Sequence, residues 1–145
     1  MPPADRKDPY RNYNFLVEID GVTVAGFAEC SGVCIETTVV EYRNGNELNH
    51  VRKLPGLTKY SNIVLKRGFT SEARDLWDWY KTVLDGTTER RSGSIVLLNQ
   101  ARQESARWNF RDAWPCKYEG PVFNARGNET AIETFELAVE FIELV

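Results

Sequence analysis

The sequence predicts a mainly β protein with one α-helix, arranged as a β-barrel or sandwich of about seven strands with the helix on its flank. Most of the chain shows the two-residue alternation of apolar and polar side chains that is typical of half-buried strands. Only residues 65–86 have the three- and four-residue spacing of an amphipathic helix. Such a helix needs a sheet to cover its apolar stripe.

The N-terminal third of the chain reads as strands. Residues 1–11 are polar and proline-rich, so we expect a flexible N-terminal arm. Alternation then predicts a strand with four side chains on one face, namely Tyr13, Phe15, Val17 and Ile19. Asp20-Gly21 indicates a tight hairpin and residues 22–30 a return strand. The β-branched run at residues 33–41 predicts a third strand.

Residues 42–56 form a polar segment that is longer than the two to five residues of an ordinary hairpin loop. A loop of this length is either loosely ordered or used for a contact. Strand character resumes at residues 58–67, with Ile63 and Leu65 on one face.

The helix is predicted to begin at Thr70 or Ser71, because a hydroxyl can accept from an N–H that lacks a helical partner. It should end at Gly86, which can adopt a positive φ, giving a length of about 14 residues. Trp79 lies off the predicted apolar stripe and is a candidate for a protein contact. The stripe consists of Ala73, Leu76, Trp77, Tyr80 and Leu84.

The C-terminal part again alternates. Residues 94–99 and 108–118 read as strands, and Pro115 within the second indicates an edge or a bulge. The last strand is expected over residues 129–145, with an apolar face of Phe135, Leu137, Val139 and Phe141. Its opposite face, which must meet water, carries Thr134, Glu136, Ala138 and Glu140.

Length and composition predict one domain over residues 1–145. The net charge of −3 argues against nucleic-acid binding, which needs a concentrated basic surface. No apolar run approaches the ~20 residues that span a bilayer, and the polar N-terminus does not resemble a secretory signal. The three cysteines are expected to be reduced thiols and mostly small buried fillers.

No catalytic residue, cofactor site or metal site is predicted. His50 lies in a polar loop, where a solvated side chain is expected, and the C-x3-C pair of Cys30 and Cys34 lacks the further ligands of a zinc site. The carboxylate pairs Glu129–Glu133 and Glu136–Glu140 are expected on a solvated strand face. These features favour assembly over catalysis.

Six stretches together resemble a known family. They are residues 8–21 (DPYRNYNFLVEIDG), 26–32 (GFAECSG), 41–68 (EYRNG to VLKRG), 76–80 (LWDWY), 110–121 (FRDAWPCKYEGP) and 127–140 (GNETAIETFELAVE). In this order they are similar to the tail tube proteins of contractile bacteriophages and phage-tail-like contractile injection systems. The tubes of type VI secretion systems have a similar fold.

The resemblance implies that six subunits form a ring, that their sheets join into one inner barrel, and that rings stack into a hollow tube within a sheath. Residues 42–56 then correspond to an extended segment that reaches the adjacent ring. The implied inter-ring contact residues are Arg43, Asn44, Gly45, Glu47, Leu48, His50, Arg52, Lys53 and Leu54. The lumen-facing candidates are Thr134, Glu136 and Glu140, which would make an acidic bore that repels acidic cargo.

The implied partners are other copies of the chain, sheath and baseplate proteins, and a cargo of DNA or protein effector, with no membrane anchoring. Assembly is expected in the bacterial cytoplasm, with the protein ending in a phage virion or a released particle. Two alternatives stay open at this point. One is a tube-initiator or adaptor paralogue of the same fold, and the other is a monomeric β-barrel that binds a small ligand.

Overall fold

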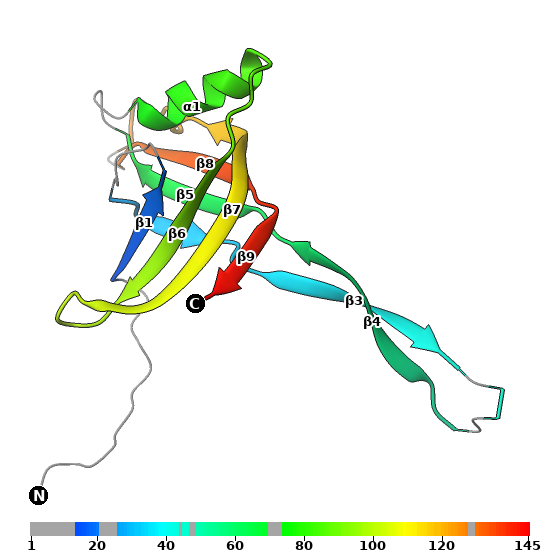
Figure 1. Ribbon diagram of the computed structural model, residues 1–145. Helices are drawn as coiled ribbons and strands as arrows, with labels where there is room; N and C mark the ends of the chain where they lie inside the picture. Colours follow the sequence, from blue (N-terminus) through cyan, green and yellow to red (C-terminus); the bar gives the residue numbers. More distant parts are fainter. Residues whose placement is uncertain (1–13, 21–25, 44, 47–48, 70–73, 128–129) are drawn as a thin grey trace, which may run out of the picture.

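The computed structural model describes residues 14–20, 26–43, 45–46, 49–69, 74–127 and 130–145. Within these ranges the chain forms nine strands and one helix (Figure 1). They are β1 (Phe15–Ile19), β2 (Glu29–Ser31), β3 (Ile35–Tyr42), β4 (Arg52–Tyr60), β5 (Ile63–Gly68), α1 (Asp75–Leu84), β6 (Arg91–Leu98), β7 (Glu104–Glu119), β8 (Ile132–Ala138) and β9 (Phe141–Leu144). The N-terminal arm predicted at residues 1–11 lies outside the described residues.

Seven strands form the main sheet, which follows the order β1-β6-β7-β8-β5-β2 with β9 paired to β7. The 16-residue strand β7 divides this sheet into two walls. Its first half pairs with β6 and β9, which with β1 make the first wall; its second half pairs with β8, which continues through β5 to β2 as the second wall. The predicted fold class, mainly β with one helix and about seven sheet strands, is confirmed.

The sheet turns from one wall to the other within β7. Asp112 has a positive φ of 56°, and the register with β8 shifts between Pro115 and Lys117, so the predicted bulge at Pro115 is confirmed. The segment that pairs with β7 is interrupted between β8 and β9, at Val139 and Glu140, and the Glu140 N–H donates to Arg111 O. The prediction of one unbroken strand over residues 129–145 is therefore wrong, because that segment turns the same corner.

The core fills the space between the two walls. Val17, Ile95 and Phe110 come from the first wall, and Leu65 and Phe135 come from the second. Gly93 allows β6 to lie close to β1 and to the Phe110 ring, because a Cβ there would lie 2.2 Å from Glu18 O and 2.6 Å from Phe110 Cζ. Only glycine fits at this position without displacing β1 or the Phe110 ring.

One pairing prediction and one strand prediction are wrong. β1 pairs with β6 and β2 pairs with β5, so the described strands on either side of Asp20-Gly21 do not form a hairpin with each other. The strand predicted over residues 58–67 is two strands, because the chain leaves the β3–β4 pair at Ser61 and enters the second wall at Ile63.

Helix α1 lies across the second wall and differs in part from its prediction. Gly86 has a φ of 78° and follows the helix end, as predicted. Leu76 is buried and Trp77 and Tyr80 are half-buried, but Leu84 is 62% exposed and does not belong to the stripe. Ala73 and the predicted N-caps lie outside the described residues.

Trp79 is fully buried, so its predicted place off the stripe is also wrong. Its indole N–H donates to Glu89 O at 2.7 Å, and the Arg91 guanidinium lies 5.0 Å from its ring centroid. The segment that follows the helix thus folds back and covers a second side of α1. Helical spacing could not indicate this cover, because it comes from residues outside the helix.

The three thiols differ in exposure. Cys30 packs against the core and Cys116 is half-buried, whereas Cys34 is exposed and is not a buried filler. Burial, reinforced by the neighbouring Glu29 carboxylate, raises the pKa of the Cys30 thiol from 9.0 to about 12.

Replacing Trp79 with alanine should lower the free energy of unfolding by about 3–5 kcal/mol, because it removes a large buried ring and leaves Glu89 O without its donor. Leu84→Ala on the same helix is the control and should change it by less than about 0.5 kcal/mol. Urea unfolding followed by fluorescence measures both. Equal losses in the two variants would contradict this burial pattern.

Thiol labelling should separate Cys34 from Cys30. At pH 8 a thiol of pKa about 12 is ionised in only about one molecule in ten thousand, so Cys30 should stay unmodified by iodoacetamide in the folded protein. Cys34 is exposed and should react first. Peptide mass mapping gives the order, and rapid native labelling of Cys30 would contradict its placement.

Candidate assembly surfaces

The most prominent surface feature is the two-stranded ribbon of β3 and β4, here called the extended hairpin. It pairs from Ile35–Tyr60 at its base to Tyr42–Arg52 near its tip and projects away from both walls (Figure 1). Every described residue of the two strands is exposed except Tyr60. An isolated two-stranded ribbon is only marginally stable in water, so its length indicates that it has a partner.

The sequence of the hairpin explains its regularity. The Thr37 and Thr58 hydroxyls hydrogen-bond across the strands at 3.0 Å. The register shifts between Thr37 and Val39, and opposite this point a Cβ on Gly56 would lie 3.0 Å from Thr38 O and from Val40 Cγ2. The shift changes the twist of the ribbon. At the base, the Tyr60 ring lies 5.4 Å from the Phe141 ring and anchors the hairpin to β9.

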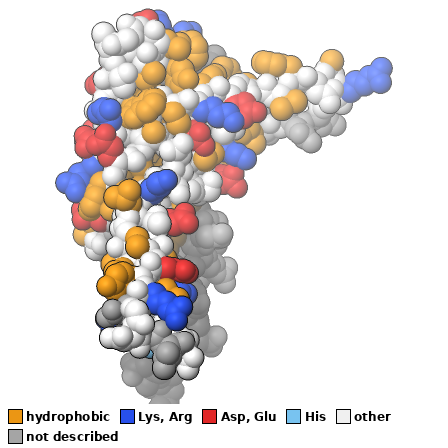
Figure 2. Space-filling model, turned by 90° about the vertical axis from the view of Figure 1, so that its right-hand side faces the viewer, with side chains coloured by type: hydrophobic (Ala, Val, Ile, Leu, Met, Phe, Trp, Pro, Cys, Tyr) orange, Lys and Arg blue, Asp and Glu red, His pale blue; other side chains and the backbone are white. Residues whose placement is uncertain are grey.

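The hairpin exposes large apolar side chains. Figure 2, in which the hairpin runs toward the viewer in the lower half of the picture, shows hydrophobic side chains spaced along it between basic and acidic ones. They are Ile35, Val39, Val40, Tyr42, Leu54 and Leu57, and Leu57 is the most exposed of them at 77%. Apolar surface of this extent on one element is typical of a protein contact.

The predicted contact residues fall on this hairpin, but the predicted loop is too long. Residues 52–56 belong to β4 and pair with β3, because a neighbouring strand satisfies the backbone of this polar segment. Arg52, Lys53 and Leu54 are therefore strand residues, whereas Arg43, Gly45 and His50 lie in the connection. Asn44, Glu47 and Leu48 lie outside the described residues.

The outer face of the second wall carries two of the three lumen candidates. Thr134 pairs with Lys66 and Glu119, and Glu136 pairs with Val64 and Lys117, so carboxylates and lysines alternate across this face. The face is mixed in charge, not purely acidic. Glu140 is not part of it, because it lies at the break after β8 and forms an ion pair with Arg90 at 2.8 Å.

A buried ionic cluster ties α1 to the second wall. The Arg67 guanidinium donates to Glu133 and, at 2.6 Å, to Asp75, and the Tyr118 hydroxyl donates to the other Glu133 oxygen at 3.1 Å. Burial lowers the Arg67 pKa, but the hydrogen bonds to Asp75 and Glu133 outweigh it, so the pKa is raised. Glu133 is 2% exposed, so its predicted place on a solvated face is wrong. Its partner Arg67 is distant in sequence, and the alternation alone gave no sign of the pair.

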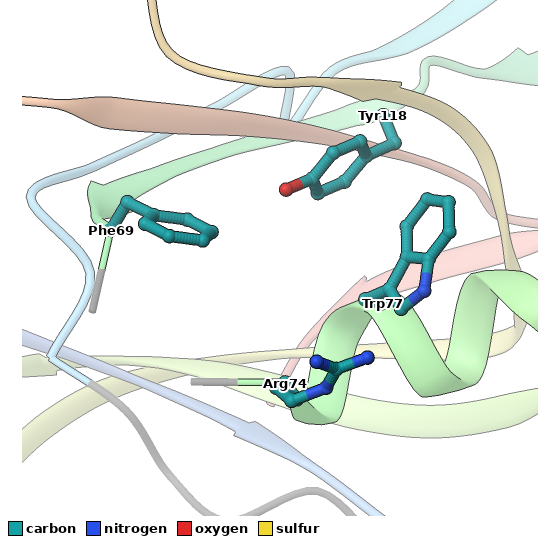
Figure 3. Close-up of a pocket in the computed structure, with 4 residues that line it drawn as sticks. All are labelled: Phe69, Arg74, Trp77 and Tyr118. Carbon is teal, nitrogen blue, oxygen red and sulfur yellow. The ribbon is translucent and has the colours of Figure 1, made fainter. Parts of the chain in front are cut away.

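Beside this cluster lies an apolar pocket of about 310 Å³. The rings of Phe69, Trp77 and Tyr118 and the side chain of Arg74 line it (Figure 3). Trp77 and Tyr118 meet edge to face at 5.3 Å between centroids. Sequence reasoning missed Phe69 and Arg74, because nothing in their local spacing marks a pocket that three separate segments build.

Two kinds of functional feature, a metal site and a membrane-spanning helix, are not found among the described residues. Among them, no group of three or more His, Cys, Asp or Glu side chains is placed to hold a metal ion. In the same part of the chain, no helix is both long and apolar enough to cross a membrane.

Comparisons with known proteins point to assembly. A family model described as the T4-like virus tail tube protein gp19 matches residues 11–143. The chain resembles one in the sheath-tube complex of an extracellular contractile injection system, PVC, in the extended state, with 27% identity, a TM-score of 0.86 and coverage of 94% of this chain and 91% of that one.

A chain of the anti-feeding prophage cap, which terminates the tube of that particle, is 25% identical with a TM-score of 0.89, over 100% of this chain and 99% of that one. Hcp1 from Flavobacterium johnsoniae shares the fold alone, at 15% identity and a TM-score of 0.58 over 91% of this chain and 94% of that one. No curated protein matches the chain.

Proposed function

We propose that six copies of this chain close into a ring and that such rings stack into a hollow tube. The premise is that the chain belongs to the T4-like virus tail tube protein gp19 family and is a structural subunit of a contractile tail tube. The observation that carries the proposal is the pair of open borders of the second wall. Among the described residues, no strand pairs with the outer edge of β2 or with the outer edge of the second half of β7. Unpaired strand edges need partners, and a head-to-tail contact between these two borders would close a ring.

The second wall then lines the lumen with Thr134 and Glu136. Four strands from each of six copies would give roughly 24 strands, which at a spacing of about 4.8 Å enclose a circumference of about 115 Å and a diameter of about 37 Å between backbones. This width exceeds the ~10–12 Å of a single helix and leaves room for a polypeptide or nucleic-acid cargo. The alternating charges would keep the wall hydrated without strongly attracting either cargo.

The other partners follow from the same architecture. A similar chain belongs to a sheath-tube complex, and on that basis we propose that the outward surface of α1 and the first wall faces a sheath, with a baseplate at the tube end. The chain would act as a wall that carries out no catalysis and needs no cofactor. Assembly in a bacterial cytoplasm would precede incorporation into a phage or phage-like particle.

The mass of the assembled protein tests the ring. Purified protein should sediment as a species of about 100 kDa, six times the chain mass of 16.6 kDa, or as longer assemblies, and electron microscopy should show hollow tubes. A stable monomer at high concentration would overturn the proposal and favour a small ligand-binding barrel. Rings that never stack would instead favour the initiator or adaptor alternative.

Shortening the extended hairpin should block stacking and leave rings. Joining Glu41 to Lys53 through an Asn-Gly turn removes residues 42–52 while keeping a paired rung at the new end. The thermal midpoint should stay within a few degrees, because none of the described residues among those removed belongs to the core. Tubes of normal length would contradict the role of the hairpin.

A point variant makes the same test without changing the hairpin length. Leu57→Asp places a charge on its most exposed leucine, and Leu84→Asp makes the matched change on α1 at 62% exposure. Only the first should reduce tube length in electron micrographs.

A further inference from the structure

We infer that the pocket formed by Phe69, Arg74, Trp77 and Tyr118 is the socket for an apolar side chain from the extended hairpin of a second copy in the next ring. This inference rests on the proposed stacking of rings and names the surface that receives the hairpin. The occupant is another copy of this chain, because the same molecule carries both complementary parts.

The two parts lie at opposite ends of the molecule. The hairpin leaves the end of the second wall where β5 begins, whereas Phe69 follows the other end of β5 and Arg74 directly precedes α1 (Figure 1). When two copies are stacked in line, a contact between opposite ends is head to tail and leaves one hairpin and one socket of the pair unoccupied. It therefore propagates in one direction, which is what a growing stack of rings requires.

The chemistry of the two surfaces agrees. Three rings and the Arg74 side chain make an open apolar socket (Figure 3). The hairpin presents aliphatic side chains, such as Val40 and its cross-strand neighbour Leu54, outward from a narrow ribbon. A strand edge or ribbon can approach such a socket closely, which a helix or a flat sheet face cannot do as readily.

Charge supports the same orientation. The outer half of the hairpin carries Arg43, Arg52 and Lys53 against Glu41 among its described residues. Near the socket, Asp78 neighbours Trp77 on α1, and its carboxylate is exposed. A basic side chain of the hairpin on one copy can then meet Asp78 on the next, and Arg74 can meet Glu41.

One such contact is small, and this suits its role. A ribbon of about eight residues reaches about 26 Å, which spans to a neighbouring ring but buries less than a stable pairwise interface needs. Six identical contacts between two preformed rings act together, because the first engagement raises the effective concentration for the others. Single chains would then stay apart while rings stack.

Cross-linking distinguishes this arrangement from any contact within a ring. In a background with Cys34→Ser and Cys116→Ser, Val40→Cys and Phe69→Cys are combined in one chain, and assembled protein is treated with a short bis-maleimide. Links between successive rings should give a ladder of covalent species that continues beyond six chains, whereas links around one ring stop at six. Tubes that show no linkage, or a ladder ending at six, would overturn the inference.

Substitution at the socket gives an independent readout. Arg74→Glu and Phe69→Asp should leave rings intact by sedimentation and raise the critical concentration for tube growth about a hundredfold, since six contacts weaken together. Lys81→Glu, an exposed position on the same helix, is the control and should have no effect. Normal tubes from both socket variants would refute the socket, whereas an absence of rings in the unmodified protein would refute the proposed function itself.

Discussion

Strand β7 is the constraint on which the architecture depends, because its 16 residues belong to both walls. The positive φ at Asp112 and the register shift after Pro115 turn the strand, and the break at Val139 and Glu140 lets its partner turn with it. Without the corner, the same strands would make one flat sheet with two wet faces and no enclosed core. With it, the first wall covers the core, and no other described strand pairs with the two borders of the second wall.

The buried Arg67 cluster fixes α1 on this frame. Its ion pairs join β5, β8 and the first turn of the helix, so the helix start cannot shift along the wall without breaking a buried pair. Hydrophobic packing alone would hold the helix less specifically, because apolar contacts are not directional. The same cluster positions Tyr118 and the start of α1, and these set the shape of the pocket. A stabilising feature and a proposed contact surface therefore share one set of side chains.

Local patterns in the sequence predicted those features of the fold that depend on residues close together in the chain. Alternation identified most strands, and the bulge at Pro115 and the helix end at Gly86 follow from the backbone chemistry of those residues. The rest depends on residues distant in the chain. Glu133 is buried because Arg67, 66 positions earlier, neutralises it, and Trp79 is buried because residues 89–91 return past the helix. The pocket draws on three segments, so no local spacing could have indicated it.

In the proposed assembly, the extended hairpin needs apolar side chains to bind the next ring and polar side chains to stay in solution before it binds. Its strand register comes from its own β-branched residues and from the hydrogen bond between the Thr37 and Thr58 hydroxyls, so binding would order it at a lower entropy cost than an unpaired loop. Its charges interrupt the apolar row and disfavour the edge-to-edge pairing to which a long bare ribbon is prone. In the proposed assembly, strand edges would close rings through directional backbone hydrogen bonds, whereas the hairpin would bind the next ring through its side chains. Because the two contacts use different chemistry, ring closure and stacking can proceed in order and need not compete for the same surface.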